Sequence, residues 1–318
     1  MKTMEWGFLI VNYLFLGGLS AGLFFVSALA TFLYKIDEPS PYTRIARLGA
    51  LLAPWPVMIG CVLLIFDLGR WYRFYKLFLH LRLVSPMSIG SWLLILFTLV
   101  SLVNCYAWLT ENQRSTLFAK LPRGLAFFSK FNYDIDHWRR RLALAGLPTS
   151  VGVGIYTGVL LGAVQSRPFW NTNLVAQLFL FSAFSTGCAA LILGLSGRET
   201  SAQELRLLYG LDICFMVLEF FIVLPYLIHG ELSVQAVQDS LKLVLGGPFT
   251  ILFWVFFLGL GLLTPLVIEL RELVPVIVSN REFHYNRLLA ASTALLILGG
   301  GFLLRYIFVF AGQMSAMQ

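Results

Sequence analysis

The most conspicuous reactive residues in the sequence are an acid and two arginines in the segment DLGRWYRF. Asp67, Arg70 and Arg73 stand three residues apart at the end of a long apolar stretch. Ionisable groups at the edge of a hydrocarbon layer are costly unless they pair or face a polar cavity. Asp67 and Arg70 lie one helical turn apart and could simply pair with each other. Alternatively, these groups bind a polar ligand.

Other polar residues recur at a similar depth in separate apolar stretches. They are Asn12, Tyr13, Tyr156 and Arg305. Arg305 has no acid within four residues, so its partner must come from another helix or from a ligand. A lipid-accessible pocket lined by a carboxylate, arginines and a tyrosine suits a quinone head group, which accepts hydrogen bonds at two carbonyls. In this interpretation Asp67 exchanges a proton with the ring, while Tyr156 and an arginine hydrogen-bond its oxygens.

Further acids occur in the second half of the chain. Asp212 and Glu219 are seven residues apart, which is two turns along one helix face. Such a pair could form a proton pathway, or it could be structural, through pairing with Arg305 or capping. Glu269 and Glu272 flank an arginine at a predicted helix end, where we expect them to be solvated or to snorkel to the surface.

The composition indicates which elements must position these residues. The 318 residues are 58% hydrophobic and 12% charged, which is more apolar than a soluble domain. Several stretches can cross about 30 Å of hydrocarbon, and none alternates as β-barrel strands would. We therefore predict an all-α integral membrane protein, with residues 1–318 forming a single domain. Its eight transmembrane helices are expected at 8–34, 48–70, 87–109, 142–165, 174–196, 207–229, 248–270 and 287–311.

The positive charges are sorted between the two sides of this arrangement. Of the 23 Lys and Arg residues, 15 fall in the loops 35–47, 110–141, 197–206 and 271–287. Loops of this kind face the cytoplasm, so both termini are expected outside. The sorting also accounts for the net charge of +7 without a nucleic-acid partner. The aromatic and basic loop 110–141 is expected to lie against anionic lipid headgroups.

The positions of the cysteines and histidines indicate whether this chain can hold a redox cofactor of its own. The four cysteines fall in different predicted spans and none belongs to a CxxC motif, so neither an iron–sulfur cluster nor another metal site is expected in this chain. The four histidines lie in loops or at span ends, whereas a b-type haem needs paired histidines within helices. No intrinsic haem is expected. Electrons exchanged with a quinone would then leave through another protein.

Two glycine-containing segments resemble each other. FLGGLSAG at 15–22 and LFSAFSTG at 180–187 share Ser-x-Gly in a similar setting. This similarity suggests a duplication of four helices plus four. Small residues at helix contacts are common for packing reasons alone, so both explanations stand.

Taken together, these motifs resemble the NrfD/PsrC family, the membrane subunits of polysulfide-reductase-like and nitrite-reductase-associated complexes. The resemblance runs nearly end to end. Its marks, in sequence order, are WGFLIVNYLFLGGLSAG at 6–22, DLGRWYRF at 67–74, SPMSIGSW at 85–92, YTGVLL with RPFW at 156–170, LFSAFSTG at 180–187, GGPFTILFW at 246–254 and LRYIFVFAGQ at 304–313.

The resemblance implies two four-helix bundles, no haem or iron–sulfur cluster in this subunit, and a site for menaquinone or ubiquinone near the outer face. It also implies a ferredoxin-like iron–sulfur subunit as partner, linked to a molybdopterin or multihaem cytochrome catalytic subunit. By position, the family's helix-two acid is Asp67, the arginine after it is Arg73, and the helix-four tyrosine is Tyr156. Some members contact the quinone through a helix-one histidine, where this chain offers Asn12 or Tyr13.

We therefore expect a quinone-reactive membrane subunit of a respiratory oxidoreductase, in the inner membrane of a bacterium or archaeon and inactive by itself. Proton translocation is compatible with the buried acids. Two alternatives remain. A secondary transporter is supported by the repeat and the acids, and a structural anchor would use its charges only to hold helices together.

Overall fold

The structure is a computed structural model that describes residues 6–33, 42–67, 85–120, 135–164, 166–196, 202–279 and 286–315. Across these ranges, every regular element is a helix and eight spans are long and apolar enough to cross a membrane. The prediction of an all-α multi-pass membrane protein with eight transmembrane helices is confirmed. The helices are α1 (Phe8–Leu33), α2 (Tyr42–Leu52), α3 (Pro54–Asp67), α5 (Pro86–Trp108), α6 (Glu111–Lys120), α7 (Ile135–Gly162), α8 (Leu174–Ser196), α9 (Ala202–Glu231), α10 (Gln235–Leu245), η3 (Leu252–Leu263), α11 (Thr264–Ser279) and α12 (Arg287–Met314).

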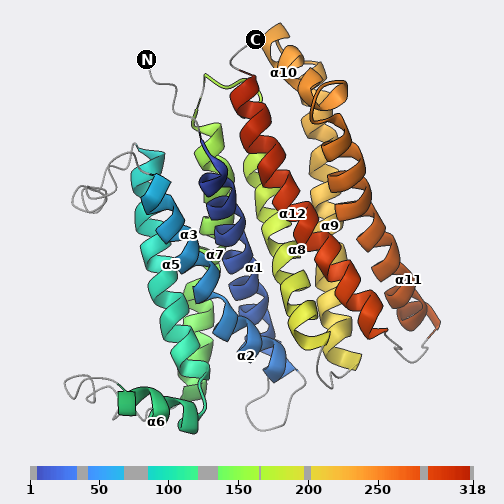
Figure 1. Ribbon diagram of the computed structural model, residues 1–318. Coiled ribbons are helices and arrows are strands. Elements are labelled where there is room, and N and C mark those ends of the chain that lie inside the picture. The colour runs from blue at the N-terminus through green and yellow to red at the C-terminus, as the bar shows by residue number, and fades with distance from the viewer. Residues whose placement is uncertain are drawn as a thin grey trace.

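The helices are arranged around a central pair, α1 and α8 (Figure 1). Helix α1 packs against α3, α7, α8 and α12, and α5 lies outside α7. Helix α8 packs against α9 and α12, with η3 and α11 beyond them. We call the end where α1 begins and α12 ends the terminal face, which is the upper end in Figure 1, and the other end the opposite face. The division into two four-helix bundles stays a prediction, because α1 and α8 contact each other along the centre.

The crossing of α1 and α8 depends on the matched glycines of the two similar segments. A Cβ on Gly22 would lie 2.0 Å from the carbonyl oxygen of Ala183, and a Cβ on Gly187 would lie 2.3 Å from the carbonyl carbon of Gly22. Only glycine permits this approach of two backbones. The last residues of FLGGLSAG and LFSAFSTG therefore contact each other, as a two-fold relation between the halves would require. The duplication itself remains a hypothesis.

Several helix bounds differ from the predicted spans. The second span is broken at Pro54 into α2 and α3, since proline lacks the N–H that would continue the helix. Helices α7, α9 and α11 extend well past the apolar stretches, because hydropathy marks the part inside the lipid and not the whole helix. Helix α10 lies in a predicted loop. Helix α6 lies across the opposite face (Figure 1), within the loop predicted to follow the membrane surface.

Candidate functional site

Two buried tyrosines meet between α1, α3, α5 and α7. Tyr13 of α1 is fully buried, and its ring carbon Cδ2 lies 3.5 Å from the Cβ position of Gly60 on α3. The ring of Tyr156 on α7 lies over Gly90 of α5, where an added Cβ would be 1.7 Å from ring carbon Cζ. The two phenol groups are neighbours. We call Tyr13, Gly60, Gly90 and Tyr156 the tyrosine site.

The hydroxyl of Tyr13 is the unusual group of this site. It is buried, and within the described part of the chain no protein atom forms a well-aligned hydrogen bond with it. Burying a hydroxyl without a hydrogen-bond partner costs free energy, so such groups are rare in folded proteins. A ligand carbonyl placed beside it would supply the missing acceptor.

Asp67 lies at the rim of this region. It is the last residue of α3 and is partly exposed, and its Oδ1 lies 4.0 Å from the Cβ position of Gly7 at the start of α1. Seven residues separate it from Gly60, so it lies about 10 Å closer to the terminal face than the tyrosines. Arg70 and Arg73 fall outside the described residues, and their predicted roles and the possible pairing with Asp67 stay predictions.

The side chain of Asn12 points away from the tyrosine site, unlike that of its neighbour Tyr13. It is partly exposed, and its Nδ2 donates a hydrogen bond of 2.8 Å to the carbonyl oxygen of Phe8 on the same helix. The amide is therefore occupied within α1. Of the two residues that could replace a helix-one histidine, Tyr13 is the one that lies beside Tyr156.

Arg305 has its partners elsewhere. It is 0% exposed, and its Nη1 donates to the Ser182 hydroxyl and to the Gly301 carbonyl, both at 2.7 Å. Its Nη2 donates to the Phe179 carbonyl at 3.3 Å and lies 3.1 Å from the Cβ position of Gly18. The guanidinium is thus held by α8 and α12 and faces α1. The structure brings Tyr13 and Tyr156 together but positions Arg305 on the other side of α1.

The two acids of α9 are buried, and one of them, Glu219, lies beside this arginine. Glu219 is close enough to Arg305 for their charges to interact, and the Ser182 hydroxyl is within hydrogen-bonding reach of its carboxylate. Asp212 accepts a hydrogen bond of 2.6 Å from the Ser185 hydroxyl, and its Oδ2 has no partner in the described structure. The pair therefore lies in the protein interior, next to α8.

The expectation that Glu269 and Glu272 would be solvated or snorkelling is wrong for Glu269. This side chain is 1% exposed, and neither carboxylate oxygen has a hydrogen-bond partner within the described ranges. Its carboxylate interacts with those of Asp212 and Glu272. Glu272 is half-buried and within hydrogen-bonding reach of Tyr209 on α9. The predicted span ended at residue 270, whereas α11 continues to Ser279 and presents both acids to α9.

These groups lie along α9 and on the part of α11 that packs against it. We call Tyr209, Asp212, Glu219, Glu269 and Glu272 the acid row. Sequence reasoning identified Asp212 and Glu219 but missed Glu269. The available signal was its position within TPLVIELRELV, where apolar residues continue on both sides of the acid.

Four residues from distant motifs meet at the terminal face. The Trp6 N–H donates to Gln313 Oε1 at 3.0 Å, and Gln313 Nε2 donates to the Trp6 carbonyl at 2.8 Å. Trp6 stacks on Trp170 with ring centroids 5.1 Å apart, and Trp170 Nε1 donates to the Phe308 carbonyl at 2.6 Å. Arg167 donates to the Gln313 carbonyl. We call Trp6, Arg167, Trp170 and Gln313 the terminal cap.

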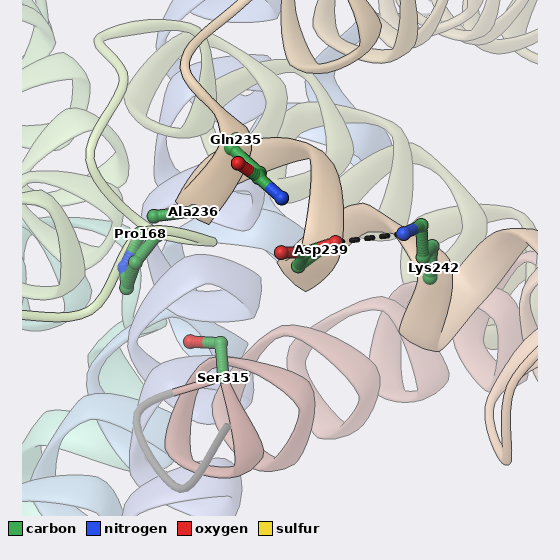
Figure 2. Close-up of a pocket in the computed structure, with 6 residues that line it drawn as sticks. All are labelled: Pro168, Gln235, Ala236, Asp239, Lys242 and Ser315. Carbon is green, nitrogen blue, oxygen red and sulfur yellow. Dashed lines mark hydrogen bonds and ion pairs between the residues drawn. The ribbon is translucent and has the colours of Figure 1, made fainter.

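A hollow of about 490 Å³ opens beside this cap (Figure 2). Pro168 and the end of α12 at Ser315 line one part, and α10 supplies Asp239 and Lys242. Lys242 Nζ donates to Asp239 Oδ1 at 2.7 Å, and this hydrogen bond raises the pKa of Lys242. The hollow is therefore a surface feature outside the predicted spans. It does not include the tyrosine site.

Fold and site together define a class: a multi-pass helical membrane protein that buries ionisable groups among its helices. The sequence matches the family Polysulphide reductase, NrfD over residues 1–316. The protein belongs to this family. It is 32% identical to a polysulfide reductase chain of Wolinella succinogenes, over 98% of the present sequence and 95% of that protein.

Two further relatives extend the comparison. The protein NrfD of Escherichia coli is 30% identical, over 99% of the present sequence and 96% of its own length. A selenate reductase subunit of Mesobacillus selenatarsenatis is 26% identical, over 83% of the present sequence and 66% of that protein. The family and these relatives make the protein a membrane subunit of an oxidoreductase complex.

Proposed function

We propose that the protein is the quinone-reactive subunit of a respiratory oxidoreductase and binds menaquinone or ubiquinone at the tyrosine site. The observation that carries this proposal is the buried, unpartnered hydroxyl of Tyr13 beside Tyr156. A bound quinone carries two electrons and two protons per turnover. Its carbonyl oxygens are acceptors of the kind that the Tyr13 hydroxyl lacks.

Each residue of the proposed site has a separate role in the quinone chemistry. Tyr13 and Tyr156 orient the ring by donating hydrogen bonds and stabilise negative charge on its oxygens. Asp67 exchanges protons between the site and the terminal face, since it is partly exposed and follows the tyrosine site along α3. Arg70 and Arg73, three and six residues further on, supply positive charge near that carboxylate.

The electrons enter or leave through a partner that docks on the terminal face. The partner we propose is a ferredoxin-like iron–sulfur subunit, which is linked to a molybdopterin or multihaem cytochrome catalytic subunit. The relatives named as parts of polysulfide and selenate reductases support such a complex. The proposed location is the inner membrane of a bacterium or archaeon, with both termini outside.

The decisive test is the substitution Asp67→Asn in the assembled complex. We expect quinol-dependent turnover to fall about a hundredfold, because the proton-exchanging group is lost. The matched control is Asp239→Asn on α10, a partly exposed acid away from the tyrosine site, which should leave turnover unchanged. Recovery of both complexes by affinity purification verifies assembly.

Other outcomes would favour the alternatives. Unchanged turnover in Asp67→Asn contradicts the role of this acid. If a quinone analogue titrated into the complex has no effect on activity, the subunit is a structural anchor. Binding of a polar solute by the isolated protein, independent of quinone and partners, would instead indicate a transporter.

A further inference from the structure

Three arginines from three helices meet at the opposite face. Arg114 of α6 and Arg139 of α7 both donate hydrogen bonds to the carbonyl oxygen of Ala107 on α5, at 2.8 and 3.1 Å. Because the two guanidinium groups share one oxygen, their positive charges are neighbours. Arg47 of α2 lies beside them, since its Nη2 donates a hydrogen bond of 3.3 Å to Oε1 of Gln113, the residue before Arg114. We call Arg47, Arg114 and Arg139 the arginine cluster.

Aromatic rings at the end of α5 hold two of these guanidinium groups in place. The guanidinium of Arg139 lies over the ring of Trp108, 4.3 Å from its centroid, and that of Arg114 lies over the ring of Tyr106 at 5.1 Å. Both arginines are partly buried. Side chains that are already ordered lose less conformational freedom when they bind a ligand.

The arginine cluster has more hydrogen-bond donors than its protein partners use. A guanidinium group carries five N–H donors. Within the described residues, Arg114 donates to the Ala107 carbonyl and Arg47 donates to Gln113, and the Nε atom of each arginine lacks an acceptor. Neither of these two arginines forms an ion pair in that part of the chain. Adjacent positive charges with unused donors favour a bound anion.

The arginine cluster lies at the depth of the lipid headgroups. Its three members are near the ends of apolar spans, which begin at Tyr42, end at Trp108 and begin again at His137. Helix α6, which carries Arg114, lies across the opposite face (Figure 1). The ends of such spans are where the hydrocarbon layer gives way to charged headgroups. An anion at this depth can therefore belong to a lipid.

An exposed apolar stripe on α5 runs toward the arginine cluster. The stripe consists of Leu99, Leu102 and Val103. Tyr106 continues the same helix face, and the guanidinium of Arg114 lies over its ring. An acyl chain that follows this stripe would bring its headgroup phosphate to the arginines.

We propose that the arginine cluster binds the phosphate of an anionic phospholipid whose acyl chain follows the stripe on α5. The phosphate oxygens accept hydrogen bonds from Arg47 and Arg114, and the negative charge offsets the charges of all three guanidinium groups. The bound lipid thereby joins α2, α6 and α7 at the opposite face. This inference does not depend on the proposed quinone function.

Lipid titration of the delipidated complex tests the proposal. The complex is held in a neutral detergent, and either phosphatidylglycerol or phosphatidylcholine with identical acyl chains is added. Native mass spectrometry measures how many lipids bind and how tightly. We expect one phosphatidylglycerol to bind about tenfold more tightly than phosphatidylcholine, because the choline group cancels the charge of the phosphate. In Arg114→Gln the affinity of this phosphatidylglycerol should fall about tenfold.

Three further variants keep the result interpretable. Arg206→Gln removes an exposed arginine near the start of α9 and should leave the affinity unchanged. Arg114→Lys keeps the charge but not the planar pair of donors, so it should restore only part of the affinity. If Arg114→Gln fails to assemble, Arg47→Gln replaces it, since that arginine gives up only the hydrogen bond of 3.3 Å to Gln113. It should also weaken phosphatidylglycerol binding.

Glycerol 3-phosphate distinguishes a lipid from a soluble phosphate compound. It carries a phosphate but no acyl chain, so it should not displace phosphatidylglycerol from the complex. Displacement would identify a soluble phosphate compound as the ligand and overturn the lipid assignment. Equal affinities for phosphatidylglycerol and phosphatidylcholine also overturn the proposal. So does an unchanged affinity for phosphatidylglycerol in the arginine-to-glutamine variant of the cluster that assembles.

Discussion

The tyrosine site and the acid row differ in how their polar groups are buried and in which partners those groups have. In the tyrosine site, the ring of Tyr13 packs against Gly60 and the ring of Tyr156 packs against Gly90. The nearby acid Asp67 is partly exposed. In the acid row, carboxyl groups are sealed inside, and Arg305 next to them is held by three hydrogen bonds. In the proposed assignment the first region binds a ligand, whereas the second region buries ionisable groups and the hydrogen-bonded Arg305. Removing a polar group should therefore reduce activity in the first region and stability in the second.

The largest effect is expected from Arg305→Leu. This change leaves Glu219 and the Phe179 carbonyl without their buried partner, which costs about 3–5 kcal/mol of folding free energy. We expect almost no folded complex, as measured by size-exclusion chromatography and thermal unfolding. The control Arg287→Leu, at the exposed start of α12, should leave the yield unchanged. A normal yield of Arg305→Leu would show that Arg305 is not needed for folding.

Tyr13→Phe should give the opposite result. The hydroxyl has no hydrogen-bond partner in the described structure, so its removal should change the free energy of unfolding by only about 1 kcal/mol or less. Quinol-dependent turnover should fall about a hundredfold, because an oriented donor to the ring is lost. Steady-state kinetics measures the loss, with Tyr306→Phe on α12 as control. Unaltered kinetics would remove Tyr13 from the site.

Gly90→Ala tests the shape of the tyrosine site. The new Cβ would overlap the ring of Tyr156, so that the phenol must move, at a cost of about 1–3 kcal/mol. A quinone analogue should bind more weakly, as measured by calorimetric titration of the complex. Gly299→Ala is the matched control, since nothing lies within 4 Å of its Cβ position. Equal affinities in the two variants would contradict the assignment.

The smallest effect is expected outside both regions, in the terminal cap. Gln313→Ala removes the two hydrogen bonds to the Trp6 backbone and should cost about 1–2 kcal/mol. Turnover should be nearly normal at low temperature, and the temperature of half-inactivation should fall. A large loss of turnover at low temperature would mean that the cap takes part in catalysis or in partner docking.

The sequence predicted the spans well, because apolar length alone determines which segments can cross a membrane. It also proposed Tyr156 and, with Asn12 as the alternative, Tyr13 as site residues, and the structure brings the two tyrosines together. Two features escaped it. Hydropathy ends a span where charges begin, so the continuation of α11 and the burial of Glu269 were missed. Spacing along one helix gives no distance to another, so the separation of Arg305 from Tyr156 required the packed structure.

Short motifs that lie far apart in the sequence pack against each other in pairs. Gly90 of SPMSIGSW receives the ring of Tyr156 from YTGVLL. Gly22 and Gly187 contact each other across the α1–α8 crossing. These contacts join segments that are far apart in the sequence, so a linear sequence does not reveal them.

The terminal cap also has a consequence for how the protein is made. Trp6 and Gln313 are 307 positions apart, so the ribosome must finish the last helix before the first can be fastened. Until then, the backbone of Trp6 lacks both of its hydrogen bonds to Gln313. A polypeptide that stops before α12 would leave Trp6 without its Gln313 partner, so the start of α1 would be held less firmly than in the full-length protein.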